Sequence, residues 1–328
     1  MRELAVCPHP QWKALIFRSE EAGESLPEPL VRELSNAGIA RIDAGEISYE
    51  QFFAEKEQTA DNQQITEKQE NTDNQKNTEN REDTKAKPES VPDGKSVLVL
   101  SARDQDLNWL KGQNIAALAY RSAAYPNEEL FAAEYMTEDV RELDLEFLDR
   151  VFRRAHGIPW HILSTGRCLV DEIRQEDRED LIRLYEPPDM TRYLHGQQEN
   201  LLTREGLDAY IRHAYRYYGY GMWSVRDRHT DELIGCAGIY PETWEKEQVL
   251  ALGYAIRQDR WHQGYATEVC QAVLAWVEQE FGEETELFCF VDTGNSASKR
   301  LAEKLGFGPY SVSREKSRDI TVYRYFHR

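Results

Sequence analysis

Two adjoining stretches decide the fold: ALGYAIRQDRWHQGYATEVCQAVLAWVEQEF at residues 251–281 and ELFCFVDTGNSASKRLAEKLGF at residues 286–307. Together they predict a strand, a glycine turn, a long amphipathic helix, a second strand and a capped helix. Gly264 lets the backbone approach a ligand closely, and the helix after it directs unpaired N–H groups and a positive dipole end toward any phosphate there. This order of elements can build a site for a pyrophosphate-bearing cofactor.

Two motifs in these stretches carry a family resemblance. WHQGYATE at residues 261–268 resembles the acetyl-CoA pyrophosphate loop of the GNAT acetyltransferase family, closest to the branch that acetylates ribosomal-protein N-termini and some antibiotics. NSAS at 295–298, followed by EKLGF at 303–307, is similar to the family's next helix. The resemblance covers roughly residues 165–328. It implies a GNAT-type mixed sheet flanked by helices, acetyl-CoA as the acetyl donor, and a primary amine as the acceptor.

The resemblance also implies which residues hold the cofactor. The strand at 249–256 would bind the pantetheine arm as an added strand would bind, and the loop would offer main-chain N–H groups to the pyrophosphate. His262 departs from the family, where glycine is usual, and would either contact phosphate or face water. Asn295 is a good N-cap that would also bond the pantetheine arm. The predicted cofactor-binding residues are Tyr254, Ala255, Ile256, Trp261, His262, Gln263, Gly264, Tyr265, Ala266, Thr267, Asn295, Ser298 and Lys299.

Acid and base are harder to assign, because acetyl transfer requires that the amine lose a proton and that the CoA thiolate be protonated or stabilised. Many family members use a tyrosine as the acid where this chain has Ala302, so Ser298 and Tyr254 are the catalytic candidates. Many relatives carry a glutamate where this chain has Ala251. Several carboxylates are candidates for a base that acts through a water molecule. Positioning an amine that is already neutral would itself supply much of the rate enhancement. The candidate bases are Glu242, Glu245, Glu247 and Asp292.

We therefore expect direct attack of the amine on the thioester in a ternary complex. A covalent intermediate on cysteine is not expected, since Cys289 lies inside an apolar strand. Ala251 and Ala302 motivate an alternative, a CoA-binding regulatory or scaffolding protein with little or no turnover. The acceptor would be a small-molecule amine, a peptide N-terminus or a lysine.

Composition limits the class of protein. The 328 residues carry 59 acidic and 40 basic groups, a formal net charge of −19, with no lysine/arginine stripe. A nucleic-acid surface is disfavoured, whereas the acidic charge either attracts cationic partners or only confers solubility. The five cysteines are scattered without metal-ligand spacing, which predicts reduced thiols, no metal site and a cytoplasmic protein. No signal peptide or apolar run of membrane-spanning length is evident.

The N-terminal half predicts a discontinuous, Rossmann-like parallel α/β domain over residues 1–55 and 95–160, because short apolar strands alternate with helices. Between these parts, residues 56–94 include the near-repeat QENTDNQKNTEN at 69–80 and read as a disordered insertion, or alternatively an interaction tail. LIFRSE at 15–20 and Ser101 weakly resemble the haloacid-dehalogenase-like core. Arg18 stands where that family needs its aspartate nucleophile, so no phosphatase activity is expected.

Overall fold

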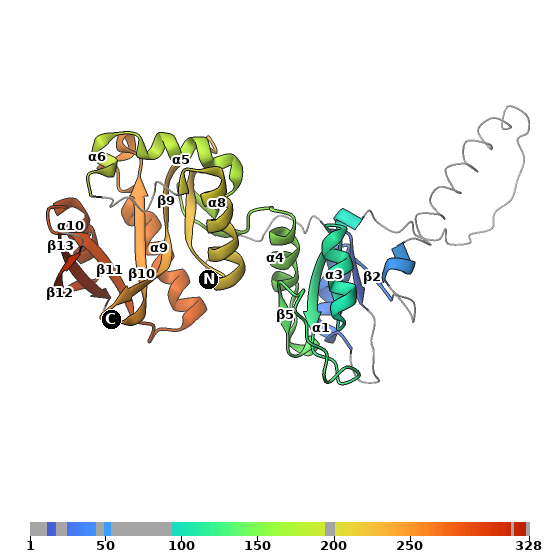
Figure 1. Ribbon diagram of the computed structural model, residues 1–328. Coiled ribbons are helices and arrows are strands. Elements are labelled where there is room, and N and C mark those ends of the chain that lie inside the picture. Colours follow the sequence, from blue (N-terminus) through green and yellow to red (C-terminus); the bar gives the residue numbers. More distant parts are fainter. Residues whose placement is uncertain are drawn as a thin grey trace, which may run out of the picture. The chain divides into compact units, whose positions relative to one another are not determined.

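The computed structural model describes residues 12–17, 25–43, 49–53, 94–193, 201–315 and 318–325. The chain divides into two compact units between His156 and Gly157, and each contains its own sheet (Figure 1). Arg18 lies outside the described residues, as does the predicted insertion at 56–94 except for its last residue.

The N-terminal unit contains a five-stranded sheet in the order β2-β1-β3-β4-β5, and every neighbouring pair is parallel. Both β1 and β3 are buried along their whole length, as strands covered on two faces must be. The predicted parallel sheet is therefore confirmed. The elements are β1 (Ala14–Phe17), α1 (Glu28–Asn36), β2 (Ala40–Ile42), η1 (Gly94–Ser96), β3 (Val97–Ser101), α3 (Asp104–Gly112), β4 (Ala116–Tyr120), β5 (Met136–Thr137), η2 (Val140–Glu142) and α4 (Leu145–Ala155).

The C-terminal unit contains an eight-stranded mixed sheet in the order β12-β13-β11-β10-β9-β8-β7-β6. The pair β10–β11 is parallel, and the other neighbouring pairs are antiparallel. This arrangement confirms the predicted mixed sheet. The strands are β6 (His161–Ser164), β7 (Cys168–Glu172), β8 (Met222–Asp227), β9 (Leu233–Trp244), β10 (Glu247–Ile256), β11 (Leu287–Asp292), β12 (Phe307–Glu315) and β13 (Arg318–Tyr325).

Helices cover both faces of this sheet. On one face the ring of Trp223 in β8 packs edge-on against Trp276 of α9, with centroids 4.8 Å apart. On the other face the side chain of Tyr185 in α5 hydrogen-bonds Cys236 of β9. The helical elements are η3 (Gln175–Asp177), α5 (Arg178–Tyr185), α6 (Pro188–Thr191), α8 (Arg204–Ile211), η4 (Arg212–Tyr218), η5 (Gln258–Arg260), α9 (Tyr265–Phe281) and α10 (Ser296–Leu305).

The helix that begins with α8 changes its form partway along. α8 gives way at Arg212 to a π-helix that ends at Gly219. The wider turn lets the hydroxyls of Tyr210 and Tyr215 both hydrogen-bond the main chain of Met222, which an α-helix would not allow at a spacing of five residues. β6, which precedes residue 165, forms one edge strand of the C-terminal sheet.

Candidate active site

The sheet opens between its two parallel strands. β10 and β11 are neighbours in register only at Leu250–Leu287 and Ala251–Phe288. β10 continues to Ile256 paired with β9, while β11 continues to Asp292 paired with β13. The two strands therefore diverge beyond Ala251 and leave one edge of β10 available to a ligand.

Strand alternation determines which main-chain groups face this gap. The N–H of Arg257 donates to the carbonyl of Ile234 in β9 at 2.8 Å. Because successive residues of a strand direct their N–H and C=O groups to opposite sides, Ile256 and Tyr254 direct theirs toward the gap. Ala255 directs its own toward β9, where it pairs with Cys236. Three strand residues were predicted to bond the cofactor through the main chain. This geometry favours main-chain bonds from Tyr254 and Ile256, and it leaves Ala255 only its side-chain methyl group for a cofactor contact.

The loop after β10 presents a set of free donors. Gly264 adopts φ 85°, in the left-handed region, and serves as the N-cap of α9. The first backbone bond at this end of the helix runs from the N–H of Glu268 to the carbonyl of Gly264, at 3.0 Å. Within the described parts of the chain, no backbone acceptor takes the preceding N–H groups, those of Gln263, Gly264, Tyr265, Ala266 and Thr267. Unpaired donors at a helix N-terminus are suited to binding an anion.

The structure explains the local roles of two residues of the loop, His262 and Trp261. His262 adopts φ 58°, in the left-handed region where glycine is favoured, which explains why its position suits glycine. Its own presence there costs roughly 1–2 kcal/mol. The indole N–H of Trp261 donates to the carbonyl of Ile256 at 2.6 Å, which takes up a group that faces the gap. Both side chains are exposed.

A polar clamp, formed by Thr165, Arg167 and Glu268, holds this loop in place. The Glu268 carboxylate accepts hydrogen bonds from the Thr165 hydroxyl at 2.6 Å, from the Arg167 N–H at 2.9 Å and from Arg167 Nε at 2.7 Å. Arg167 in turn donates from Nη1 to the carbonyl of Gln263 at 3.0 Å and lies 4.0 Å from the centre of the Tyr265 ring. Burial opposes ionisation of Glu268, but these hydrogen bonds outweigh it and lower its pKa.

No sequence pattern marks Thr165 or Arg167 as a site residue, and Glu268 is marked only as part of the loop motif. Thr165 and Arg167 lie before β7, about a hundred positions away from Glu268, and no local pattern links such distant segments. One available signal was Glu268 itself, an acid in the first turn of a helix whose N-terminus is predicted to bind a phosphate.

The two catalytic candidates lie together. The phenol of Tyr254 on β10 donates to the main-chain carbonyl of Ser298 on α10 at 3.4 Å. Burial raises the pKa of Tyr254 far above that of a free phenol, so the hydroxyl keeps its proton. Asn295 caps α10 by accepting the Ser298 N–H at 3.0 Å, as expected, and Lys299 is half-buried one residue further along the helix. Ala302, where a tyrosine is common, is buried.

The four candidate bases do not lie equally close to the gap. Glu245 and Glu247 stand at the turn between β9 and β10, and the stretch of β10 from Glu247 to Tyr254 spans about 24 Å at about 3.4 Å a residue. Glu242 is displaced toward the same end of the sheet, where it pairs with Val249. Asp292 instead ends β11, at the open end of the gap, where it accepts the N–H of Gly294 at 2.8 Å.

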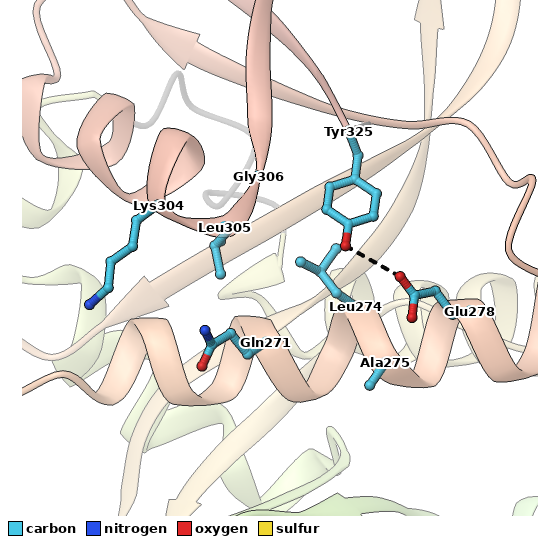
Figure 2. A pocket seen from close by; sticks show the side chains of 8 residues that line it. All are labelled: Gln271, Leu274, Ala275, Glu278, Lys304, Leu305, Gly306 and Tyr325. Carbon is cyan, nitrogen blue, oxygen red and sulfur yellow. Dashed lines mark hydrogen bonds between the residues drawn. The ribbon is translucent and has the colours of Figure 1, made fainter. Parts of the chain in front are cut away.

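A separate groove of about 330 Å³ lies between α9 and the C-terminal end of α10 (Figure 2). Tyr325 donates from its hydroxyl to Glu278 across it at 3.3 Å. The groove borders Leu305 and Gly306, whereas Ser298 and Asn295 lie toward the opposite end of α10, about 10 and about 15 Å from Leu305 along the helix axis. None of the predicted site residues lines it, and the strand gap is the better candidate site.

Within the parts of the chain that the structure describes, no group of three or more His, Cys, Asp or Glu side chains is arranged to hold a metal ion. Likewise, none of the helices placed by the structure has the length and apolar character needed to cross a membrane.

Comparison with known proteins places the likeness in the C-terminal half. The Acetyltransferase (GNAT) domain model matches residues 167–308. The uncharacterized protein YkkB of Bacillus subtilis (strain 168) is 33% identical over 165 residues, which cover 48% of this chain and 94% of YkkB. The uncharacterized N-acetyltransferase YoaA of the same organism is 30% identical over 157 residues, 47% of this chain and 86% of YoaA.

Among solved structures, the ribosomal-protein-S5-alanine acetyltransferase from Vibrio fischeri superposes with a TM-score of 0.43 at 12% identity, covering 50% of this chain and 96% of that one. The weak resemblance of the N-terminal half to the dehalogenase-like core stays a prediction. In that unit Ser101 ends β3, where its hydroxyl accepts the N–H of Arg103 at 3.2 Å and donates to Asp106 at 3.3 Å.

Proposed function

The chain belongs, through its C-terminal half, to the GNAT acetyltransferase family, and we propose that it moves an acetyl group from acetyl-CoA to a primary amine by direct attack in a ternary complex. The observation that carries this proposal is the divergence of β10 from β11 beside a helix N-terminus with free N–H groups. An open strand edge suits the amide-bearing arm of a ligand, and the helix N-terminus that follows it suits the ligand's pyrophosphate.

The residues present fit that ligand. The gap-facing N–H and C=O of Tyr254 and the N–H of Ile256 would pair with the amides of the pantetheine arm, as in β-augmentation. The carbonyl of Ile256 is already bonded by Trp261. The N–H groups of residues 263–267 would receive the pyrophosphate, with Thr267 adding a hydroxyl. The side-chain amide N–H of Asn295 would reach the arm while its oxygen caps α10. Bound acetyl-CoA would supply an activated acetyl thioester to the attacking amine.

Proton transfers would then fall to a small set of groups. Tyr254 is a protonated phenol on the strand that borders the gap, and we assign it as the donor to a departing thiolate. Its hydroxyl contacts the main chain of Ser298, whose own hydroxyl is the second candidate. Asp292 is the carboxylate best placed to accept the amine proton through water. Cys289 is unsuited to carry the acetyl group, since it is buried and burial raises its pKa to about 12.

The alternative is a CoA-binding regulatory or scaffolding protein with little or no turnover, favoured by the buried alanines Ala251 and Ala302. It differs in one outcome: acetyl-CoA would bind without steady acetylation of any amine in a broad panel. The panel should contain polyamines, aminoglycosides, amino acids, peptide N-termini and lysine peptides.

A matched pair of substitutions tests the cofactor site. Aspartate and asparagine at position 267 have nearly the same shape, and a negative charge near a helix N-terminus stabilises the helix, so neither variant should unfold it. Only Thr267→Asp places a negative charge beside the expected pyrophosphate. One added charge near a surface site is worth about 1–3 kcal/mol, so the acetyl-CoA Kd measured by calorimetry should rise about 10- to 100-fold relative to Thr267→Asn. Equal affinities for the two variants would contradict the proposed location.

A further inference from the structure

The edge of the C-terminal sheet carries a serine, a histidine and an aspartate in one hydrogen-bonded row. His161 Nδ1 lies 2.6 Å from Oδ1 of Asp171, and His161 Nε2 lies 3.0 Å from Oγ of Ser164. These distances fall within the range found between a nucleophile, its base and the group that orients the base. The three residues come from β6 and β7 and are not part of the proposed acetyl-transfer site.

A β-bulge makes the row possible. In a regular strand, residues three apart point to opposite faces, so His161 and Ser164 would be separated by the sheet. The register jumps from His161–Asp171 to Leu163–Val170, which makes Ile162 the extra residue of a bulge. The bulge brings both side chains to the face that Asp171 occupies. Bulges are over-represented beside active sites because they redirect side chains in this way.

The hydrogen-bond chemistry gives each group a direction. A carboxylate only accepts, so Nδ1 of His161 carries a hydrogen and donates it to Asp171. In the neutral imidazole Nε2 is then an acceptor, and it receives the hydroxyl hydrogen of Ser164. The imidazole is thereby held in the tautomer that can take a proton from serine.

The row of Ser164, His161 and Asp171 also has a main-chain N–H donor near it and is partly exposed to solvent. The N–H of Thr165 donates to the carbonyl of Cys168 at 2.8 Å. By strand alternation the N–H of Ser164 points away from β7, toward the open edge of the sheet, since β6 is the last strand. The side chains of His161 and Asp171 are 18% and 22% exposed. Ser164 is itself half-buried, and its own main-chain N–H would be the donor available to the carbonyl oxygen of an acyl group bound there.

We propose that Ser164, His161 and Asp171 form a second catalytic site, which hydrolyses small acyl esters through a covalent acyl-serine. Ser164 Oγ attacks the ester carbonyl while its proton passes to His161 Nε2. The tetrahedral adduct collapses, the C–O bond to the alcohol breaks, and His161 returns the proton to the departing alkoxide. Water then attacks the acyl-serine with His161 as base, which releases the carboxylic acid and regenerates the serine hydroxyl.

The test uses the full-length protein, a fluorophosphonate probe and 4-nitrophenyl acetate. We expect the probe to label Ser164, identified by peptide mass spectrometry, and we expect Ser164→Ala and His161→Gln to reduce labelling and ester hydrolysis by about 100-fold. Ser313→Ala, which removes a half-buried serine hydroxyl on β12, should change neither. Acetyl-CoA binding should be unaffected in all three variants, which separates this site from the proposed transferase.

Asp171 is a positioning residue, so its role is tested by a measurement other than the reaction rate. Asp171→Asn should abolish the low-field proton resonance of the His161 Nδ1 hydrogen while thermal unfolding shows the domain still folded. Labelling that is absent from the wild type, or that persists in Ser164→Ala, would overturn the proposal and leave the row as a cross-strand structural contact. Hydrolysis that His161→Gln leaves unchanged would overturn it equally.

Discussion

Replacing Glu268 by glutamine should loosen the loop that precedes α9 without changing its shape. The carboxylate accepts three hydrogen bonds, two of them from Arg167, whose side chain is 41% exposed. A charge-assisted bond is worth about 1.5–3 kcal/mol, but solvent screens an exposed guanidinium and the amide oxygen still accepts. We therefore expect a net loss of about 1–2 kcal/mol, which lowers the Tm of the C-terminal unit by about 3–6 °C.

The loss should depend on pH in one direction. Because the pKa of Glu268 is lowered in the folded protein, its ionised form stabilises the fold fully above the unfolded-state pKa, and this contribution disappears as pH falls through the lowered value. The Tm gap between wild type and Glu268→Gln should thus be constant near neutral pH, begin to narrow below the unfolded-state pKa of about 4.3, and close as pH falls through the lowered pKa.

Scanning calorimetry at pH 7 and pH 3.5 measures both effects, and Glu280→Gln, an exposed glutamate on the same helix, is the matched control. The acetyl-CoA Kd of Glu268→Gln should also rise, since Arg167 positions the carbonyl of Gln263. A Tm gap that stays the same at both pH values would refute the assigned role of the carboxylate, as would a gap no larger than that of the control.

Three further outcomes are expected. His262→Gly should stabilise the protein by about 0.5–1 kcal/mol in urea denaturation, because relief of the left-handed φ exceeds the entropy cost of glycine; a loss of stability would count against it. Tyr254→Phe should lower kcat by about 100-fold with little change in acetyl-CoA affinity. Ser298→Ala is the comparison, because it keeps the main-chain carbonyl that Tyr254 contacts. An unchanged kcat in Tyr254→Phe would show that Tyr254 is not the acid. Gly238→Ala should cost about 3 kcal/mol or more, since its Cβ would meet the Gly221 carbonyl oxygen at 2.1 Å; a soluble variant with wild-type Tm would contradict this packing.

Local chemistry determined much of the C-terminal unit from the sequence alone. Gly264 and Gly282 bound α9 because both adopt positive φ, and Asn295 caps α10 through the next turn's N–H. These features depend on residues within one or two turns, so a sequence pattern contains all the information that they need. The same applies to the fully buried apolar strands of the N-terminal sheet.

Contacts between distant segments were decided by the tertiary structure. Thr165 and Glu268 are 103 positions apart, and Tyr254 and Ser298 are 44 apart. Which main-chain groups of β10 face the gap depends on its register with β9, and the row of Ser164, His161 and Asp171 depends on a single bulge. A shift of one residue in pairing sends every side chain to the other face of the sheet, and that register follows from packing across the whole domain.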